Sequence, residues 1–346
     1  MRVVVLYNAV SENASPSERD VLVQRDAVIE ALDRLGHEPL AVPCTLNFEA
    51  AAAGIRDSYG DVVFNLVESM AGSDWLSFMV TGLLDSLRLP YTGSPTEAMF
   101  LTAHKLLAKE RLCQAGLPTP AWIAADEAEP PVAPGAPTET VHRPPPAAWI
   151  IKSVSEHASL GLDESSVVGG DPAVVERRLR EQVEQWGGAW FAEEYIDGRE
   201  FNLAVLAGPQ GPETLPPAEI DFSTFPAGKR RVVGYRAKWA EDSFEYGNTP
   251  RRFDFPPSDG PLLEQLQHLS RQCWRLFKLG GYVRVDFRVD AQSRPWILEI
   301  NTNPCLSPDA GFAAAVERGS LGFDRVVQRI LDDARARGPS PGARDP

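Results

Sequence analysis

Short apolar runs alternate with longer amphipathic stretches through the first part of the chain. The run from Val3 to Tyr7 is continuous and apolar, as buried parallel strands are, and a helical pattern follows from Ser17 to Leu35. A second candidate strand covers Asp61 to Leu66, and a second candidate helix covers Trp75 to Leu87. This alternation predicts an open α/β domain over residues 1–95.

Strands and helices continue beyond this domain, with a turn signal between two of the strands. The elements predicted up to position 206 are a helix over Pro95–Ala115, a strand over Trp149–Val154, a helix over Pro172–Trp186, and strands over Trp190–Ile196 and Glu200–Leu206. The last two strands flank Asp197-Gly198, a typical two-residue turn, so we expect them to pair as a hairpin.

Two segments lack this periodicity. Residues 125–146 are dense in Pro, Ala and Glu, which predicts an extended surface segment without a catalytic role. Helices are predicted over Pro261–Leu279 and Gly322–Ala336, and we expect the tail over residues 337–346 to be disordered.

Polar residues interrupt a β-branched run near the C-terminus. If residues 290–295 form the turn of a hairpin with Asp290 opposite Pro295, Asp286 lies opposite Glu299 and Arg284 opposite Asn301. Side chains alternate faces along a strand, so these four emerge on one face. The opposite face is then filled by Val283, Val285, Phe287, Leu298 and Ile300.

Composition narrows the class of protein. The 346 residues are 43% hydrophobic, enough for one large core or two to three smaller ones. The formal charge of −14 argues against a nucleic-acid binder. The four cysteines lack CxxC spacing and the five histidines lack metal-like spacing, so neither disulfides nor zinc are predicted. No apolar run approaches the ~18 residues that a membrane helix needs, and we expect a cytoplasmic protein without a membrane partner.

The four polar residues of the hairpin suit a metal site. Two carboxylates and an amide oxygen are ligands that Mg²⁺ shares with substrate phosphates. The alternative is a half-solvated sheet whose exposed face is charged. Lys152 ends an apolar strand before a small-residue loop, Ser153 to Gly161, that fits phosphate groups, although a solvent-facing lysine is the simpler interpretation. The chain contains neither G-x-G-x-x-G nor a P-loop sequence.

Several blocks in a fixed order resemble the ATP-grasp superfamily and, within it, the D-alanine:D-alanine ligase family. They are Val63-Phe-Asn65, Pro90-Tyr-Thr-Gly93, Gly116-Leu-Pro-Thr-Pro120, Glu193-Glu-Tyr-Ile-Asp-Gly-Arg-Glu200, Arg284-Val-Asp286 and Glu299-Ile-Asn-Thr-Asn-Pro304. The resemblance implies a mixed α/β and α+β protein with an ATP-grasp fold. Its N-terminal α/β domain would cover residues 1–95, a central subdomain 96–190 and a C-terminal subdomain 191–336. It also implies small amino-acid substrates and a possible homodimer.

The resemblance also assigns roles to single residues. Lys105 and Lys152 would hold the phosphates of ATP, Glu193 and the backbone near Ile196 the adenine, and Glu200 the ribose. Asp286, Glu299 and Asn301 would bind two Mg²⁺ ions, with Mn²⁺ as a possible substitute. Arg284 would stabilise the tetrahedral intermediate, and Lys238, on a loop over Val232 to Arg251, would approach the γ-phosphate. Glu18 would orient an amino group, but Ser15-Pro-Ser-Glu18 is also a complete capping box, and the two roles are compatible.

The departures from the family pattern concern the amino-acid substrates. Glu68-Ser69 stands where the family has His-Gly, Ala158 where it has a serine, and Trp239 where it has a tyrosine. Ala310-Gly311 stands where the family has the Ser-Leu pair that holds the second D-alanine's carboxylate, and Cys305 where it has a glycine. The substrate pair therefore stays open between D-alanine, other amino acids and a carrier-bound group, and a non-catalytic ATP-binding regulator is a further alternative. Cys305 is expected to be a small buried thiol, not a nucleophile.

Overall fold

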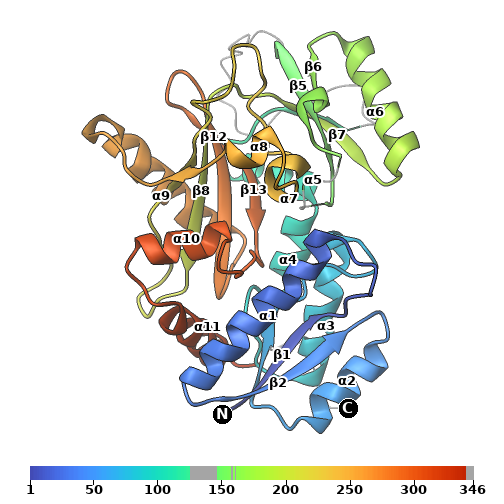
Figure 1. Ribbon diagram of the computed structural model, residues 1–346, viewed down its shortest axis with the longest axis vertical. Coiled ribbons are helices and arrows are strands. Elements are labelled where there is room, and N and C mark those ends of the chain that lie inside the picture. The colour runs from blue at the N-terminus through green and yellow to red at the C-terminus, as the bar shows by residue number, and fades with distance from the viewer. Residues whose placement is uncertain (125–145, 157–158, 160, 340–346) are drawn as a thin grey trace.

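The computed structural model describes residues 1–124, 146–156, 159 and 161–339. These residues form three sheets, and Figure 1 shows them stacked along the long axis of the molecule. The predictions for residues 125–145 of the Pro-rich segment, for Ala158 and for residues 340–346 of the tail lie outside the described residues. Arg337, predicted as part of a disordered tail, is instead the last residue of a helix. Among the described helices, none is long and apolar enough to cross a membrane.

The N-terminal sheet is parallel, with the order β2-β1-β3. Its strands are β1 (Arg2–Asn8), β2 (Glu38–Cys44) and β3 (Val62–Asn65), and its helices are α1 (Pro16–Arg34), α2 (Phe48–Asp57), η1 (Asp74–Ser77) and α3 (Phe78–Leu87). The apolar run of β1 is buried because both faces of the sheet are covered, by α1 on one side and by α2 and α3 on the other. The predicted α/β arrangement is confirmed, although β2 and α2 were not predicted.

The central sheet is antiparallel, with the order β4-β7-β5-β6. It consists of β4 (Trp122–Ala124), β5 (Ala148–Ser153), β6 (Val167–Gly169) and β7 (Trp190–Glu194), with η2 (Glu164–Ser166) before β6 and α6 (Pro172–Trp186) on one face. The helix predicted over residues 95–115 is two helices, α4 (Thr96–Ala103) and α5 (Lys105–Gln114). The break occurs because His104 is extended and its ring accepts a hydrogen bond from the backbone N–H of Leu107, which caps α5.

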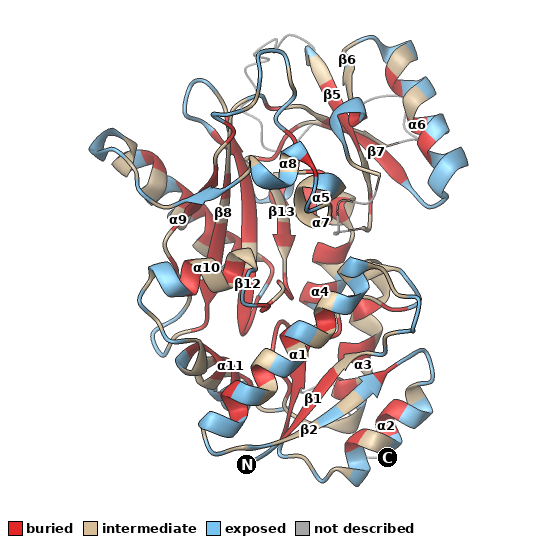
Figure 2. Ribbon diagram, in the orientation of Figure 1, coloured by how far each residue is buried: buried red, intermediate tan, exposed pale blue. Residues whose placement is uncertain are grey.

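The C-terminal sheet has the order β11-β10-β8-β12-β13, with β9 beside β8. Its strands are β8 (Arg199–Leu206), β9 (Glu213–Thr214), β10 (Ala218–Ile220), β11 (Arg251–Arg252), β12 (Tyr282–Val289) and β13 (Pro295–Asn301). The helices of this region are α7 (Tyr235–Trp239), α8 (Phe244–Gly247), η3 (Pro257–Asp259), α9 (Gly260–Leu276), α10 (Gly311–Arg318) and α11 (Phe323–Arg337). Figure 2 shows the central strands of this sheet as buried.

The hairpin predicted across Asp197-Gly198 is wrong. β7 pairs with β4 and β5, whereas β8 pairs with β10 and β12, so the two strands belong to different sheets. Gly198 serves a close approach instead, because a Cβ there would lie 2.0 Å from the carbonyl oxygen of Val289. The turn between β7 and β8 therefore joins the central sheet to the C-terminal sheet.

Candidate active site

A cavity of about 1060 Å³ lies where the three sheets meet. Its lining includes every residue that the sequence singled out for the site: Glu18, Lys105, Lys152, Glu193, Ile196, Glu200, Lys238, Arg284, Asp286, Glu299 and Asn301. Small-molecule sites usually measure about 300–1,000 Å³, so this volume suits a nucleotide together with further substrates.

The β12–β13 hairpin pairs the four polar residues as predicted, but the predicted register does not continue to the turn of the hairpin. Arg284 pairs with Asn301 and Asp286 with Glu299, but an irregularity follows, and the strands end with Val289 opposite Pro295. The predicted register of Asp290 opposite Pro295 is therefore wrong. The extra residue is Leu298, which lines the cavity, whereas Ile297 is fully buried in the core. The prediction that Leu298 fills the core face is therefore wrong, because the bulge turns Leu298 toward the cavity.

Arg284 and Asp286 form a bidentate ion pair on β12. The Nε and Nη2 groups of Arg284 donate to the two carboxylate oxygens of Asp286 at 2.8 Å each. Asn202 on β8 donates a third hydrogen bond to the same carboxylate at 2.8 Å. Burial raises the pKa of Asp286, and the nearby Glu299 raises it further, against the effect of Arg284. The repulsion between the buried carboxylate of Asp286 and the partly buried carboxylate of Glu299 would be reduced by a bound cation.

The donor set fits a hard divalent cation. No group of three or more His, Cys, Asp or Glu side chains suited to a metal occurs in the described part of the chain. The set here consists instead of the carboxylates of Asp286 and Glu299 and the amide oxygen of Asn301. Mg²⁺ is typically bound by one or two carboxylates plus substrate phosphates, so these residues suit Mg²⁺.

Two lysines, Lys109 of α5 and Lys152 of β5, lie around Glu193. Lys109 lies 2.8 Å from Oε1 of this carboxylate, and Lys152 donates to Oε2. Burial alone would raise the pKa of Glu193, but Lys109 and Lys152 lower it, so the carboxylate stays charged. Glu193 lies on the cavity wall as expected, with both oxygens held by lysines. Its position orients Lys152 toward the cavity, besides the adenine contact that the resemblance implies.

Lys105 connects α5 to the hairpin. Its ammonium donates to the carbonyl oxygen of Glu156 at 2.6 Å and lies 4.0 Å from the carboxylate of Glu299. The side chain is buried, and burial lowers its pKa. The helix break at His104 brings Lys105 to the first residue of α5.

Glu200 and Lys238 complete the C-terminal wall of the cavity. The Glu200 carboxylate lies 2.8 Å from Nη2 of Arg288, its neighbour across the β8–β12 ladder. Burial raises the pKa of Glu200, and Arg288 opposes that shift. Lys238 on α7 has its pKa lowered by burial and by Arg284, while Glu299, Asp286 and Glu200 raise it. The predicted loop lysine therefore reaches the same charged cluster.

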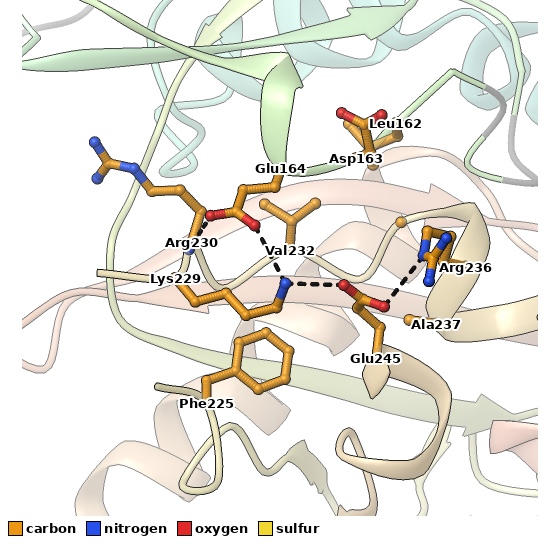
Figure 3. Close-up of a pocket in the computed structure, with 11 residues that line it drawn as sticks. Leu162, Asp163, Glu164, Phe225, Lys229, Arg230, Val232, Arg236, Ala237 and Glu245 are labelled. Atoms are coloured by element: carbon orange, nitrogen blue, oxygen red, sulfur yellow. Dashed lines mark hydrogen bonds and ion pairs between the residues drawn. The ribbon is translucent and has the colours of Figure 1, made fainter. Parts of the chain in front are cut away.

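A separate ion-pair cluster holds the segment that carries Lys238. Figure 3 shows Lys229 between Glu164 of η2 and Glu245 of α8, at 3.2 and 2.8 Å. Arg236 of α7 binds the other oxygen of Glu245 at 3.2 Å. Lys229 and the backbone hydrogen bond of Glu245 lower the pKa of this carboxyl to about 2, so it is charged at neutral pH. These contacts, here named the latch, tie the loop to the central sheet.

Residues of α1 and of the segment after β3 line the N-terminal wall of the cavity. Ser15 and Glu18 form the predicted capping box, and Glu18 still lines the cavity. Glu68 accepts a 2.8 Å hydrogen bond from Gln24. Cys305 donates to Asp20 at 2.9 Å, and burial raises the pKa of its thiol, which disfavours the thiolate that a nucleophile needs.

Four residues of the site were missed from the sequence. Lys109 has no local signal, since its partner Glu193 is far away in the chain. Arg288 extends the alternation of Arg284 and Asp286 by one step, and Asn202 alternates with Glu200 in the same way, so period-two patterning would have found both. Arg251 also lines the cavity, from the edge strand β11.

Comparisons with known proteins point to one family. Residues 112–332 match the family model described as D-ala D-ala ligase C-terminus. A D-alanine–D-alanine ligase of Gloeobacter violaceus is 30% identical over 344 residues, which cover 96% of this chain and 99% of that protein. One of Moorella thermoacetica is 29% identical over 333 residues, covering 96% and 98%. The crystal structure of D-alanine–D-alanine ligase from Bacillus anthracis complexed with ATP has a TM-score of 0.70 at 21% identity, covering 97% and 98%, which shows a shared fold.

Proposed function

The chain belongs to the D-alanine–D-alanine ligase family, as an ATP-dependent ligase with an ATP-grasp fold, and from this premise we propose that it joins two amino acids through an acyl phosphate. The observation that carries the proposal is the cluster of Arg284, Asp286, Glu299 and Asn301, with Lys105 and Lys238 in the same cavity. The three domains at 1–95, 96–190 and 191–336, and assembly as a homodimer, belong to the same proposal.

The residues of the cavity divide into a nucleotide end and a substrate end. Lys105 and Lys152 bind phosphate oxygens, Glu193 and Ile196 face the adenine, and Glu200 the ribose. Asp286, Glu299 and Asn301 would hold Mg²⁺, which would neutralise phosphate charge during transfer. Glu18 orients the amino group of the first substrate.

The first chemical step is phosphoryl transfer. A carboxylate oxygen of the donor amino acid attacks the γ-phosphorus of ATP, the bond from that phosphorus to the bridging oxygen breaks, and ADP leaves. Negative charge is carried by the transferred group throughout, so Lys105, Lys152 and Lys238 stabilise it electrostatically. Glu193 keeps Lys152 in place through its ion pair.

The second step forms the amide. The amine nitrogen of the acceptor attacks the acyl carbon, the oxyanion that forms is stabilised by Arg284, and phosphate leaves as the nitrogen loses a proton. Arg284 is preorganised because Asp286 holds two of its nitrogens, Nε and Nη2. An acyl phosphate is hydrolysed by water, so the latched loop protects the intermediate by excluding solvent.

A second candidate is the same reaction on a substrate pair other than D-alanine. It is favoured by Glu68 and Trp239, which line the substrate end of the cavity and differ from the family pattern. The nucleotide and metal end does not distinguish the two candidates.

The test measures ADP release from Mg-ATP in the presence of single amino acids and of pairs of amino acids, in the D and the L configuration, with D-alanine included. We expect release that depends on amino acid and is lost in Asp286→Ala, with loss of one electrostatic group costing ~10²- to 10³-fold in rate. Turnover with D-alanine alone supports the dipeptide ligase, and turnover only with another pair supports the second candidate. No release with any pair, with ATP still bound, contradicts ligase activity and favours the regulator.

A further inference from the structure

Two adjacent arginines on the edge strand β11 have different surroundings. Arg252 donates from Nε and Nη2 to the buried carboxylate of Glu219, at 2.9 and 2.7 Å. Arg251 points to the other side, as alternation along a strand requires, and lines the active-site cavity. One arginine is thus part of a structural ion cluster and its neighbour faces the cavity.

Arg251 has no ion-pair partner among the residues that the structure describes. Its guanidinium donates from Nη1 to the backbone carbonyl of Asp309 at 3.1 Å, and the Asp309 carboxylate acts on it from beyond ion-pair distance. Burial lowers the pKa of Arg251, and the like charge of Arg284 lowers it further. Two guanidinium groups therefore face one cavity, and the ion pair with Asp286 uses only Arg284.

The chain leaves room for this guanidinium. A Cβ at Gly311 would lie 3.2 Å from Nε of Arg251, so any side chain there would displace it. Ala310-Gly311 stands where the family pattern has a Ser-Leu pair, and the guanidinium of Arg251 lies beside Gly311. Ala310 is also the N-cap of α10 and provides no side-chain cap, so the first N–H groups of this helix lie beside Arg251.

We propose that Arg251 is a specificity-determining residue that binds the carboxylate of the acceptor amino acid. This inference rests on the proposed function, because it assumes that an amine-bearing substrate enters next to Arg284. An arginine binds a carboxylate with two parallel hydrogen bonds, one to each oxygen. An amide of the same shape is uncharged and has only one acceptor oxygen, so it cannot accept both hydrogen bonds. The guanidinium lies against Asp309 and Gly311, which follow β13 in the chain, whereas the nucleotide-side lysines come from α5 and β5.

The test is a competition between an acceptor acid and its amide. D-alanine and D-alaninamide are mixed in equal amounts with Mg-ATP, and the dipeptide and dipeptide amide are quantified by mass spectrometry; the L-pair is run in parallel. D-alaninamide has no carboxylate to activate, so it reports only on the acceptor position. The product ratio does not depend on how much of each variant is folded.

We expect the native protein to favour the acid, and Arg251→Ala to lower the acid-to-amide ratio about 10- to 100-fold, as loss of a charged hydrogen bond does. Arg251→Lys restores part of the ratio, and the KM for ATP is unchanged. Arg252→Ala is the matched control: it lowers stability but leaves the ratio unchanged. A ratio that is the same in Arg251→Ala and Arg252→Ala overturns the proposal.

A binding experiment separates this proposal from the proposed function. If no product forms, D-alanine and D-alaninamide, and the L-pair in parallel, are titrated by calorimetry into protein with Mg²⁺ and a non-hydrolysable ATP analogue. Tighter binding of the acid that is lost in Arg251→Ala and kept in Arg252→Ala supports the carboxylate site although the ligase reaction fails. Equal affinity for acid and amide, or no effect of Arg251→Ala, overturns it.

Discussion

Glu68 shows how burial changes a single residue at the substrate end of the cavity. Burial raises the pKa of its carboxyl to about 7, against the hydrogen bond from Gln24, and the charges of Asp74 and Asp20 raise it further. Arg284 acts in the opposite direction. The charge of the substrate end therefore changes close to neutral pH.

The raised pKa gives a pH dependence of stability. The folded protein binds a proton at Glu68 that the unfolded chain releases near pH 4.5, so the free energy of unfolding falls as the pH rises from about 4.5 to 7. Water in the open cavity weakens the effect of the Glu68 pKa shift on stability, so we expect the free energy of unfolding to fall by on the order of 2 kcal/mol. Glu68→Gln removes this contribution, and urea unfolding of both proteins at several pH values measures it. Parallel pH profiles for the native protein and the variant would contradict the assignment.

Glu193 is the counter-charge of two lysines, the buried Lys109 and the partly buried Lys152. Glu193→Gln leaves Lys109, which is 1% exposed, without its counter-charge. Removing one partner of a buried pair costs ~3–5 kcal/mol, so we expect a loss of that size in urea unfolding. Glu181→Gln, which removes exposed ion pairs on α6, serves as the control and changes stability by less than ~1 kcal/mol. Equal stability of the two variants would mean that Glu193 is not required by the lysines.

At the scale of elements, periodicity predicts most strands and long helices but not their partners. The helix over Pro172–Trp186 is confirmed residue for residue, because it begins with Pro and ends before Gly187. The Asp197-Gly198 turn misled the prediction, since the choice of partner for β7 and β8 depends on buried contacts far away in the chain. The bulge at Leu298 is equally non-local, whereas the break at His104 is accompanied by a local cap, in which the His104 ring accepts from the N–H of Leu107.

The same limit applies to the candidate site. Alternation along β12 and β13 placed Arg284, Asp286, Glu299 and Asn301 together, because the register near them is regular. The roles of Lys109 and Arg251 depend on tertiary contacts with Glu193 and Gly311, which no local pattern encodes.

The latch gives a prediction for the loop that carries Lys238. Lys229→Ala removes both ion pairs that connect α8 to η2. We expect the loop to open more often, so that water hydrolyses more of the acyl phosphate and the ratio of ADP released to amide formed rises several-fold. Coupled measurement of ADP and product gives this ratio. Lys278→Ala, which breaks an exposed pair with Glu97, is the control and keeps the ratio of the native protein.

If Lys229→Ala keeps ADP and amide in the native proportion, the latch does not protect the intermediate. A fall in both products without a change in their ratio would point to misplacement of Lys238 alone.

Across the whole molecule, the N-terminal and C-terminal sheets share one hydrophobic core, whereas the central sheet has smaller cores of its own. One core joins β1, β3 and α1 to α10 and α11 and to β8 and β12, so the N-terminal sheet and the C-terminal sheet are packed together. The central sheet has two small cores of its own, one with α6 and one beside α5. Its connections to the rest include the chain between β7 and β8 and the latch.

This packing predicts which part responds to nucleotide. We expect Mg²⁺ with a non-hydrolysable ATP analogue to slow amide hydrogen exchange in β5, β7 and residues 225–247, and to leave β1 and α11 unchanged. Exchange measured by mass spectrometry checks this. Uniform slowing through the chain would indicate simple global stabilisation by ligand.

The central claim is that a carboxylate is activated by phosphorylation before the amine attacks. The most direct measurement uses a donor amino acid labelled with ¹⁸O in its carboxylate, the substrate pair found by ADP release, and mass analysis of the phosphate. We expect one labelled oxygen in each phosphate released per amide formed, because the bond from the acyl carbon to the bridging oxygen breaks in the second step. Amide formed together with unlabelled phosphate would contradict it.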